Sequence, residues 1–238
     1  MEAVRCLPAT PVGALEAIAE PPALPGRPER PQLVPPQQVV ARSVATPAGR
    51  AALLHALAHI EFNAINLALD AIWRFGGLPE AFYLDWRQVA QEEALHFELL
   101  AERLRAHGHE YGDFPAHDGL WEMAAKTRGD LLARLALVPR TLEARGLDVA
   151  PAIARKLALA GDADSARVVE IILRDEIGHV AIGNRWFRFA CGAADPIDVY
   201  ARLAAAYGAP APRGPYNFAA RRQAGFTDAE LRALTKHP

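Results

Sequence analysis

The sequence predicts an all-α protein organised around a four-helix bundle. Alanine and leucine dominate a chain that is 51% hydrophobic and 23% charged, and both are strong helix formers. Apolar residues recur at helical spacing over several long segments. Two of these segments each carry a Glu-x-x-His pair, a pattern that some four-helix bundles use to bind metals in their core. The fold class therefore rests on composition, periodicity and one repeated motif.

Size and charge bound the possible functions. At 238 residues the chain is long enough for one domain with additional segments. A formal net charge of −2 implies neither nucleic-acid binding nor binding to an acidic membrane in bulk. Two cysteines, Cys6 and Cys191, are too few for a disulfide framework and favour a reducing compartment. We see neither a signal-peptide pattern nor a charge-free apolar run of about 18 residues, so we expect a cytoplasmic protein without a membrane span.

The first 45 residues are rich in proline, which restricts the backbone and removes hydrogen-bond donors. We expect this segment to be irregular, with one short helix around Val12–Ala19. Two interpretations stay open: a disordered tail, and a strap that lies on the bundle. We place the domain boundaries at 1–45 for this segment, 46–192 for the bundle and 193–238 for a C-terminal helical extension.

The first predicted hairpin contains two long helices. Thr46 and Pro47 are favourable N-cap and first-turn residues, and the first helix covers residues 46–74 before a Gly-Gly pair stops it. The second covers residues 79–107 and ends at a glycine. Residues 108–119 then form a loop that is long enough to be part of a crossover between two hairpins.

The second predicted hairpin is less regular. Residues 119–160 form one long, bent helix or two stacked helices, because Pro139 and Pro151 interrupt the helical pattern. A further helix begins at Asp162 or Asp164 and continues to about Cys191. Short helices close the chain near Asp195–Tyr207, Asn217–Gln223 and Thr227–Leu234, the last with capping-box spacing.

The pairs Glu93-x-x-His96 and Glu176-x-x-His179 each place a carboxylate and an imidazole on one face of a helix, about 5–6 Å apart at Cβ. Two such pairs, with one glutamate from each of two further helices, are the ligand set of a dinuclear metal site in a bundle. The additional glutamates are Glu61 and Glu143. In antiparallel hairpins each lies at nearly the height of the pair on the following helix. We therefore predict that these six residues bind two metal ions.

Each of these residues also has a simpler interpretation. A lone helix glutamate is usually partly exposed, and a bundle with exposed Glu and His residues binds no metal. His55 and His59 point away from the face of Glu61 and are interpreted as structural or surface residues. Glu92 and Asp175 immediately precede the two motif glutamates. Each either contacts the histidine of the opposite helix pair and accepts its second N–H, or is a surface charge.

Five strings carry a resemblance to known families: HIEFNAINLALDA, EEALHF, HDGLW, EARGLDVAP and DEIGHVAIG. With the six candidate ligands, they resemble the ferritin-like di-iron carboxylate superfamily. More narrowly, residues 45 to about 205 are similar to a bacterial ferritin-like family catalogued as domain of unknown function 455. That family is similar in its site to the di-iron hydroxylase that acts on a hypermodified tRNA adenosine. The resemblance implies a ferritin-like four-helix bundle with one long crossover and a di-metal site, and hardly anything about the substrate.

Carboxylate and imidazole donors suit iron or manganese. We expect a non-haem oxidoreductase that binds two metal ions. Iron is the expected metal, and manganese is the alternative. This enzyme would activate O2 to hydroxylate or oxidise an unknown small or nucleotide-like substrate, with an external electron donor. Two other functions stay open: a ferritin-like ferroxidase or iron-binding protein, and a metal-poor structural bundle. The segments outside the bundle disfavour a storage-cage subunit. Neither substrate nor oligomeric state follows from the sequence.

Overall fold

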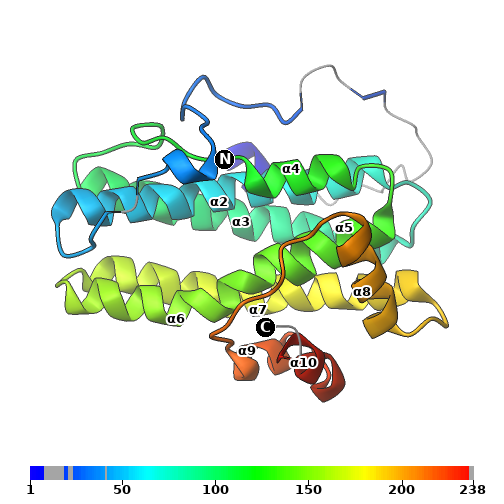
Figure 1. Ribbon diagram of the computed structural model, residues 1–238. Helices are drawn as coiled ribbons and strands as arrows, with labels where there is room; N and C mark the ends of the chain where they lie inside the picture. The colour runs from blue at the N-terminus through cyan, green and yellow to red at the C-terminus, as the bar shows by residue number, and fades with distance from the viewer. Residues whose placement is uncertain (8–18, 21–23, 41, 236–238) are drawn as a thin grey trace. The chain divides into compact units, whose positions relative to one another are not determined.

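The computed structural model describes residues 1–7, 19–20, 24–40 and 42–235. Over these residues the protein is all-α, as its sequence predicts, and the β-type pairing described there is one isolated parallel bridge between Leu33 and Ala116. Figure 1 shows the helices coloured along the chain. Their bounds are α1 Glu2–Arg5, η1 Pro36–Gln38, α2 Pro47–Arg74, α3 Glu80–Ala106, α4 Gly119–Lys126, α5 Leu131–Leu137, η2 Val138–Glu143, α6 Ala144–Leu159, α7 Ala163–Cys191, α8 Pro196–Ala206, α9 Phe218–Gln223 and α10 Asp228–Thr235.

The chain divides into two compact units. Unit 1 comprises Met1–Trp121 and Lys156–Val168, and unit 2 comprises Glu122–Arg155 and Val169–Pro238. α2 and α3 belong to unit 1, whereas α5, η2, α8, α9 and α10 belong to unit 2. α4, α6 and α7 each contribute residues to both units. The domain boundaries after residues 45 and 192 stay predictions.

The hairpin of α2 and α3 is the framework of unit 1 (Figure 1). The Thr46 side chain caps α2 by accepting a hydrogen bond from the Gly49 N–H at 3.1 Å. Tyr83 holds the turn between the helices, because its hydroxyl donates to the Phe75 carbonyl at 3.0 Å and accepts from the Leu78 N–H at 3.1 Å. The predicted ends of both helices are confirmed to within one residue, since proline and glycine punctuate them.

α2 is also long and apolar enough to cross a membrane, alone in this respect among the described helices. However, 56% of its most apolar window is buried inside the protein, and α2 packs along α3. A mostly buried helix of this composition is typical of a protein core, where apolar residues on several faces find partners.

The described part of the proline-rich segment lies along the loop that follows α3. Val34 N–H donates to the Ala116 carbonyl at 2.8 Å, and Ala116 N–H donates to the Gln32 carbonyl at 3.0 Å. Arg27 also forms an ion pair with Asp118. Residues 27–34 are therefore held against this loop, and the strap and tail interpretations of the whole segment stay predictions. The helix expected around Val12–Ala19 falls almost entirely outside the described residues.

The region predicted as one bent helix or two stacked helices is instead four successive elements, α4, α5, η2 and α6. η2 is a π-helical turn. Pro139 lies in it and has no N–H to donate to a carbonyl one turn earlier, and such a break favours a local widening of the helix. The Thr141 hydroxyl donates to the Ala136 carbonyl at 2.8 Å and satisfies a carbonyl of this widened turn. Pro151, in contrast, lies inside α6 without ending it.

The C-terminal helices are part of the core of unit 2. One apolar cluster joins residues from α6, α7, α9, the α9–α10 turn and α10: Ala144, Leu147, Val180, Ala220, Ala224, Phe226 and Leu231. Thr227 and Glu230 form the capping box that their spacing predicts, with Thr227 N–H donating to Glu230 Oε2 at 2.7 Å and Glu230 N–H donating to Thr227 Oγ1 at 3.2 Å. The cluster holds α6 and α7 together beside η2.

Gly183 provides the close contact between α7 and η2. A Cβ at this position would lie 2.6 Å from Pro139 Cβ and 2.9 Å from Pro139 Cγ, and a rigid proline ring cannot yield that space. We expect Gly183→Ala to destabilise the protein by about 1–2 kcal/mol, because overpacking outweighs the better helix propensity of alanine.

The matched control is Gly178→Ala on the same helix, where a Cβ meets nothing within 4 Å. That change is expected to stabilise the protein by about 0.5–1 kcal/mol. Urea unfolding followed by circular dichroism measures both. Equal stabilisation by the two alanines would contradict the close contact at Pro139.

Candidate metal centre

Three candidate ligands come together in unit 1. Glu61 lies on α2, and Glu93 and His96 lie on α3. One ligand atom from each lies within 4.8 Å of the others. His96 Nδ1 is 3.3 Å from Glu93 Oε2 and 3.6 Å from Glu61 Oε2. Carboxylate and imidazole groups at this spacing could hold a metal ion.

The antiparallel hairpin explains why these residues meet. Glu61 lies 13 residues before the end of α2, and Glu93 lies 13 residues after the start of α3. At about 1.5 Å rise per residue, both are equally far from the turn that joins the helices. Glu93 and His96 share one face of α3 because they are three residues apart. All three side chains are buried, with 4% of Glu61 and 0% of Glu93 and His96 exposed.

The electrostatics of this cluster are unusual for a protein core. Burial and the nearby Glu93 charge raise the pKa of Glu61 from 4.5 to about 8. Burial lowers the pKa of His96, but the Glu61 and Glu93 carboxylates beside its ring outweigh the effect of burial and raise that pKa to about 11. In the metal-free protein, protons therefore occupy the positions that a cation would otherwise take.

Both shifts make the metal-free protein less stable as the pH rises. The Glu61 pKa is higher in the folded state, so its penalty begins above the unfolded value of 4.5 and is complete near 8. The His96 contribution is fully present below its unfolded pKa of 6.5 and is lost as the pH rises through 11. Between pH 7 and 8 both act, and each bound proton changes stability by up to about 1.4 kcal/mol per pH unit.

We therefore expect the unfolding free energy of chelator-treated protein to fall from pH 7 to 8. Bound metal should reverse this slope, because deprotonated ligands bind metal better. Urea unfolding at several pH values, with and without metal, measures both slopes. A metal-free stability that rises with pH over this window would contradict the proton uptake described for Glu61 and His96.

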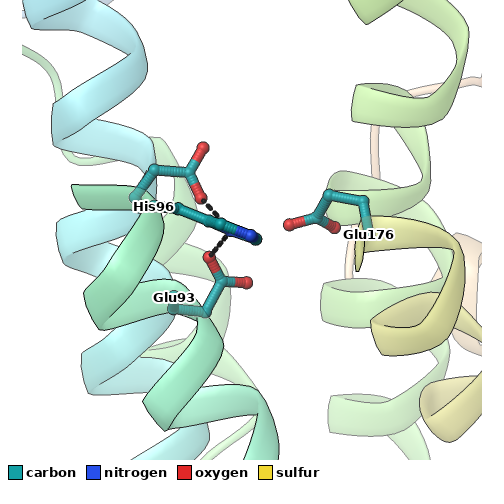
Figure 2. A group of neighbouring side chains, drawn as sticks. Glu93, His96 and Glu176 are labelled. Atoms are coloured by element: carbon teal, nitrogen blue, oxygen red, sulfur yellow. Dashed lines mark hydrogen bonds and ion pairs between the residues drawn. The ribbon is translucent and has the colours of Figure 1, made fainter. Parts of the chain in front are cut away.

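Unit 2 supplies the other three candidate ligands. Glu143 is the last residue of the π-helical η2, and Glu176 and His179 lie on α7, with His179 Nδ1 3.4 Å from Glu176 Oε1. Figure 2 shows Glu93 and His96 projecting from α3 and Glu176 projecting from α7. Exposures of 9% for Glu143, 8% for Glu176 and 0% for His179 place all three in the interior. Ala144 and Val180, the sequence neighbours of Glu143 and His179, pack in the same cluster.

Among the buried carboxylate oxygens that accept no hydrogen bond from the described residues, one in each unit is considered as a metal donor. These atoms are Glu61 Oε2 and Glu176 Oε2. Glu61 Oε2 lies 3.6 Å from His96 Nδ1, an ion-pair contact that is longer than a hydrogen bond, and a buried carboxylate oxygen without a hydrogen bond costs free energy. Such atoms are therefore well suited to a metal ion, and the donor types fit iron or manganese.

Glu92 and Asp175 have described partners on their own helices. Gln88 Nε2 donates to Glu92 Oε1 at 2.9 Å, and Arg174 Nε donates to Asp175 Oδ1 at 2.7 Å. Their contact with the histidines of the opposite helix pairs stays a prediction.

His55 and His59 are buried residues that connect α2 to the loop after α3. His55 Nε2 accepts from the Gly112 N–H at 2.9 Å, and its ring stacks on Tyr111 with centroids 5.3 Å apart. His59 Nε2 donates to the His117 carbonyl at 3.1 Å, so its Nδ1 accepts from the Tyr111 hydroxyl at 2.8 Å. Burial is the main cause that lowers the pKa of His55 to about 4 and also lowers that of His59. Both serve a structural role as neutral imidazoles.

Unit 2 also contains a buried polar network that the motifs in the sequence do not indicate. Arg140 donates to Asn184 Oδ1 at 2.8 Å and to Glu230 Oε1 at 2.6 Å. Its guanidinium also lies over the rings of Phe187 and Phe226, at 4.7 and 4.8 Å from their centroids. An arginine within the apolar string LALVPRTLEA is the available signal, but its partners are 44 and 90 residues away.

Comparison with known proteins identifies a family and a similar protein. A family model described as "Protein of unknown function (DUF455)" matches residues 4–232, a longer stretch than the resemblance in the sequence suggested. A protein of Haemophilus influenzae (strain ATCC 51907 / DSM 11121 / KW20 / Rd), described as "Uncharacterized protein", is 51% identical over 213 residues, which are 86% of this chain and 74% of the relative. No solved structure matches the chain.

Proposed function

The chain belongs to the family "Protein of unknown function (DUF455)", and on the donor set described above we propose that it is a non-haem di-metal oxidoreductase. In this proposal Glu61, Glu93, His96, Glu143, Glu176 and His179 together bind two ions. Iron is the preferred metal and manganese the alternative. The arrangement proposed for them is a ferritin-like four-helix bundle with one long crossover.

The observation that carries the proposal is a pair of buried carboxylate oxygens without a hydrogen bond within the described chain, Glu61 Oε2 and Glu176 Oε2. Glu61, Glu93 and His96 of unit 1 are buried and could hold a metal ion, and Glu176 supplies a buried carboxylate from α7. Four carboxylates balance the charge of two divalent ions, which suits a buried site. Glu143 and His179 complete the set by giving the second hairpin the same donors as the first.

Two ferrous ions would supply two electrons to O2 for the hydroxylation or oxidation of a small or nucleotide-like substrate. The side chains have separate roles in this proposal. His96 and His179 would supply one imidazole to each metal, and Glu61, Glu93, Glu143 and Glu176 would supply the carboxylate ligands. The aliphatic surroundings of these helices would exclude bulk water from the site. We also propose a cytoplasmic location and an external electron donor.

Metal content after anaerobic loading with ferrous iron and desalting tests the site. About two irons per chain would support it, and substrate-dependent O2 consumption by the loaded protein would then support the oxidoreductase. Near-zero iron and manganese would contradict the proposal and favour a metal-poor structural bundle. A large hollow oligomer with many irons per chain would favour iron storage instead.

We expect His179→Ala to lower the bound iron from about two to about one per chain, because one imidazole serves each metal. The protein should stay folded, because alanine is the strongest helix former and His179 lies inside α7. The matched control is His117→Ala, an exposed loop histidine, which should leave the iron content unchanged. Full iron occupancy in His179→Ala would contradict the ligand assignment.

A further inference from the structure

Unit 2 contains a pocket that the proposed metal chemistry does not use. It holds about 360 Å³ of space, which is within the range of small-molecule sites. α8 forms one wall and the chain at 209–212 another, and the rest comes from η2, α9, the α9–α10 turn and α10. Most lining residues are apolar, including several alanines of α8 and two prolines.

The charged groups that line this pocket are already compensated. Arg140 is bonded to Glu230, and Arg221 donates to both oxygens of Asp148 at 2.9 and 2.7 Å. Arg188 adds a second bond to Glu230 at 2.9 Å. An anionic ligand would therefore have to compete with existing carboxylates for these arginines, and a cationic ligand would be repelled by them. The pocket consequently favours an uncharged molecule.

One polar feature of the lining gives the ligand a direction. The Thr141 hydroxyl has a single proton, which it donates to the Ala136 carbonyl at 2.8 Å. Tyr200 must then donate its own proton to Thr141 Oγ1, 3.0 Å away. The lone pairs of the Tyr200 oxygen are left to accept a hydrogen bond. A hydroxyl is the uncharged group that best supplies this donor, because an amine would carry a positive charge at neutral pH.

We propose that this pocket binds an uncharged, largely hydrocarbon alcohol, with its chain among the alanines of α8 and its hydroxyl donating to Tyr200. This inference goes beyond the proposed function, because binding requires no metal. Failure of iron loading leaves the pocket in place, and failure of alcohol binding leaves the metal ligands in place. The two proposals can therefore fail independently.

The test uses the full chain and four probes in isothermal titration calorimetry. 1-Hexanol is expected to bind saturably and about fourfold more tightly than 1-pentanol, the gain from one buried methylene. 1-Methoxypentane has the same number of heavy atoms as 1-hexanol but cannot donate a hydrogen bond, and is expected to bind about fivefold more weakly. Hexanoate is expected to bind at least about tenfold more weakly than 1-hexanol.

Three variants test the location of the site. Ala204→Trp fills the pocket and should abolish binding, whereas Ala206→Trp, on the same helix but outside the pocket lining, should not. Tyr200→Phe should remove the preference for 1-hexanol over 1-methoxypentane. It is a smaller change than Ala204→Trp and still tests the proposal if Ala204→Trp does not fold. Absence of saturable 1-hexanol binding overturns the proposal. So does an alcohol preference that survives in Tyr200→Phe, or equal binding by the two tryptophan variants.

Discussion

Replacing Glu61 by glutamine is expected to remove at least one bound metal ion and, at the same time, to stabilise the metal-free protein. The bound iron should fall from about two to at most one per chain. The metal-free variant should be more stable than the metal-free parent by about 1–3 kcal/mol, because a neutral amide replaces a buried acid beside Glu93. For a chain of this size that is a rise in melting temperature of about 2–4 °C per kcal/mol.

The opposite signs of the two effects separate a ligand from a structural residue. If Glu61 held the hairpin together, its substitution would make the protein less stable. If Glu61 is a metal ligand whose carboxylate is buried at a cost in free energy, its substitution makes the metal-free protein more stable. The burial that raises the Glu61 pKa to about 8 is the physical cause. Since the penalty grows with pH up to that value, the stabilisation should be larger at pH 8 than at pH 6.

Differential scanning calorimetry of chelator-treated protein, with iron analysis of loaded protein, provides both measurements. Glu102→Gln on α3 is the matched control, because Glu102 is exposed and the change should alter neither quantity. A metal-free Glu61→Gln that melts below the parent would contradict the assignment, as would one that retains two irons.

The second large effect concerns the ion pair that fastens α9 to α6. Asp148 accepts from Arg221 Nε and from the Asn217 N–H, both at 2.9 Å, and the side chains of Asp148 and Arg221 are 0% and 3% exposed. Asp148→Ala is expected to cost about 3–5 kcal/mol, because Arg221 would be left as a buried cation without its counter-ion. Thermal unfolding should begin with the loss of α9 and α10 from the unit 2 core.

Two comparisons make this prediction specific. Asp228→Ala breaks the ion pair with Arg222, whose side chains are 59% and 64% exposed, and should cost at most about 1 kcal/mol. The double variant Asp148→Ala/Arg221→Met should recover most of the loss, because no unpaired charge remains in the core. Urea unfolding monitored by circular dichroism measures all three variants. An equal cost for the exposed and buried pairs would contradict the role of burial.

The sequence predicts most closely those elements whose ends are decided by local chemistry. α2 begins where Thr46 caps it, and α2 and α3 are separated by glycines and a proline whose effects act within a few residues. The all-α class and the capping box of Thr227 and Glu230 are local in the same sense. For unit 1, these local signals also imply that Glu61 and the Glu93–His96 pair lie at one height.

The sequence predicts less where the outcome depends on distant partners. Pro139 predicts an interruption of the helix but not its form. The structure has a π-helical turn there, with the Pro139 ring packed against Gly183 and the Thr141 hydroxyl bonded to the Ala136 carbonyl. Arg140 is buried beside Asn184 and Glu230, which lie 44 and 90 residues further along the chain and do not follow from its local sequence. The position of residues 27–34 likewise depends on pairing with Ala116, 82 to 84 residues further along the chain.

The sequence by itself therefore determined the helical class, the hairpin of α2 and α3, and the residue types offered to a metal. These follow from helix propensity, capping and periodicity, which act over one or two turns. Only the tertiary structure decided that the six candidate ligands are buried, that Glu61 Oε2 and Glu176 Oε2 accept no hydrogen bond from the described residues, and that α8 to α10 enclose a pocket. Burial and the pairing of charges depend on side chains far apart in the chain, and periodicity does not identify them.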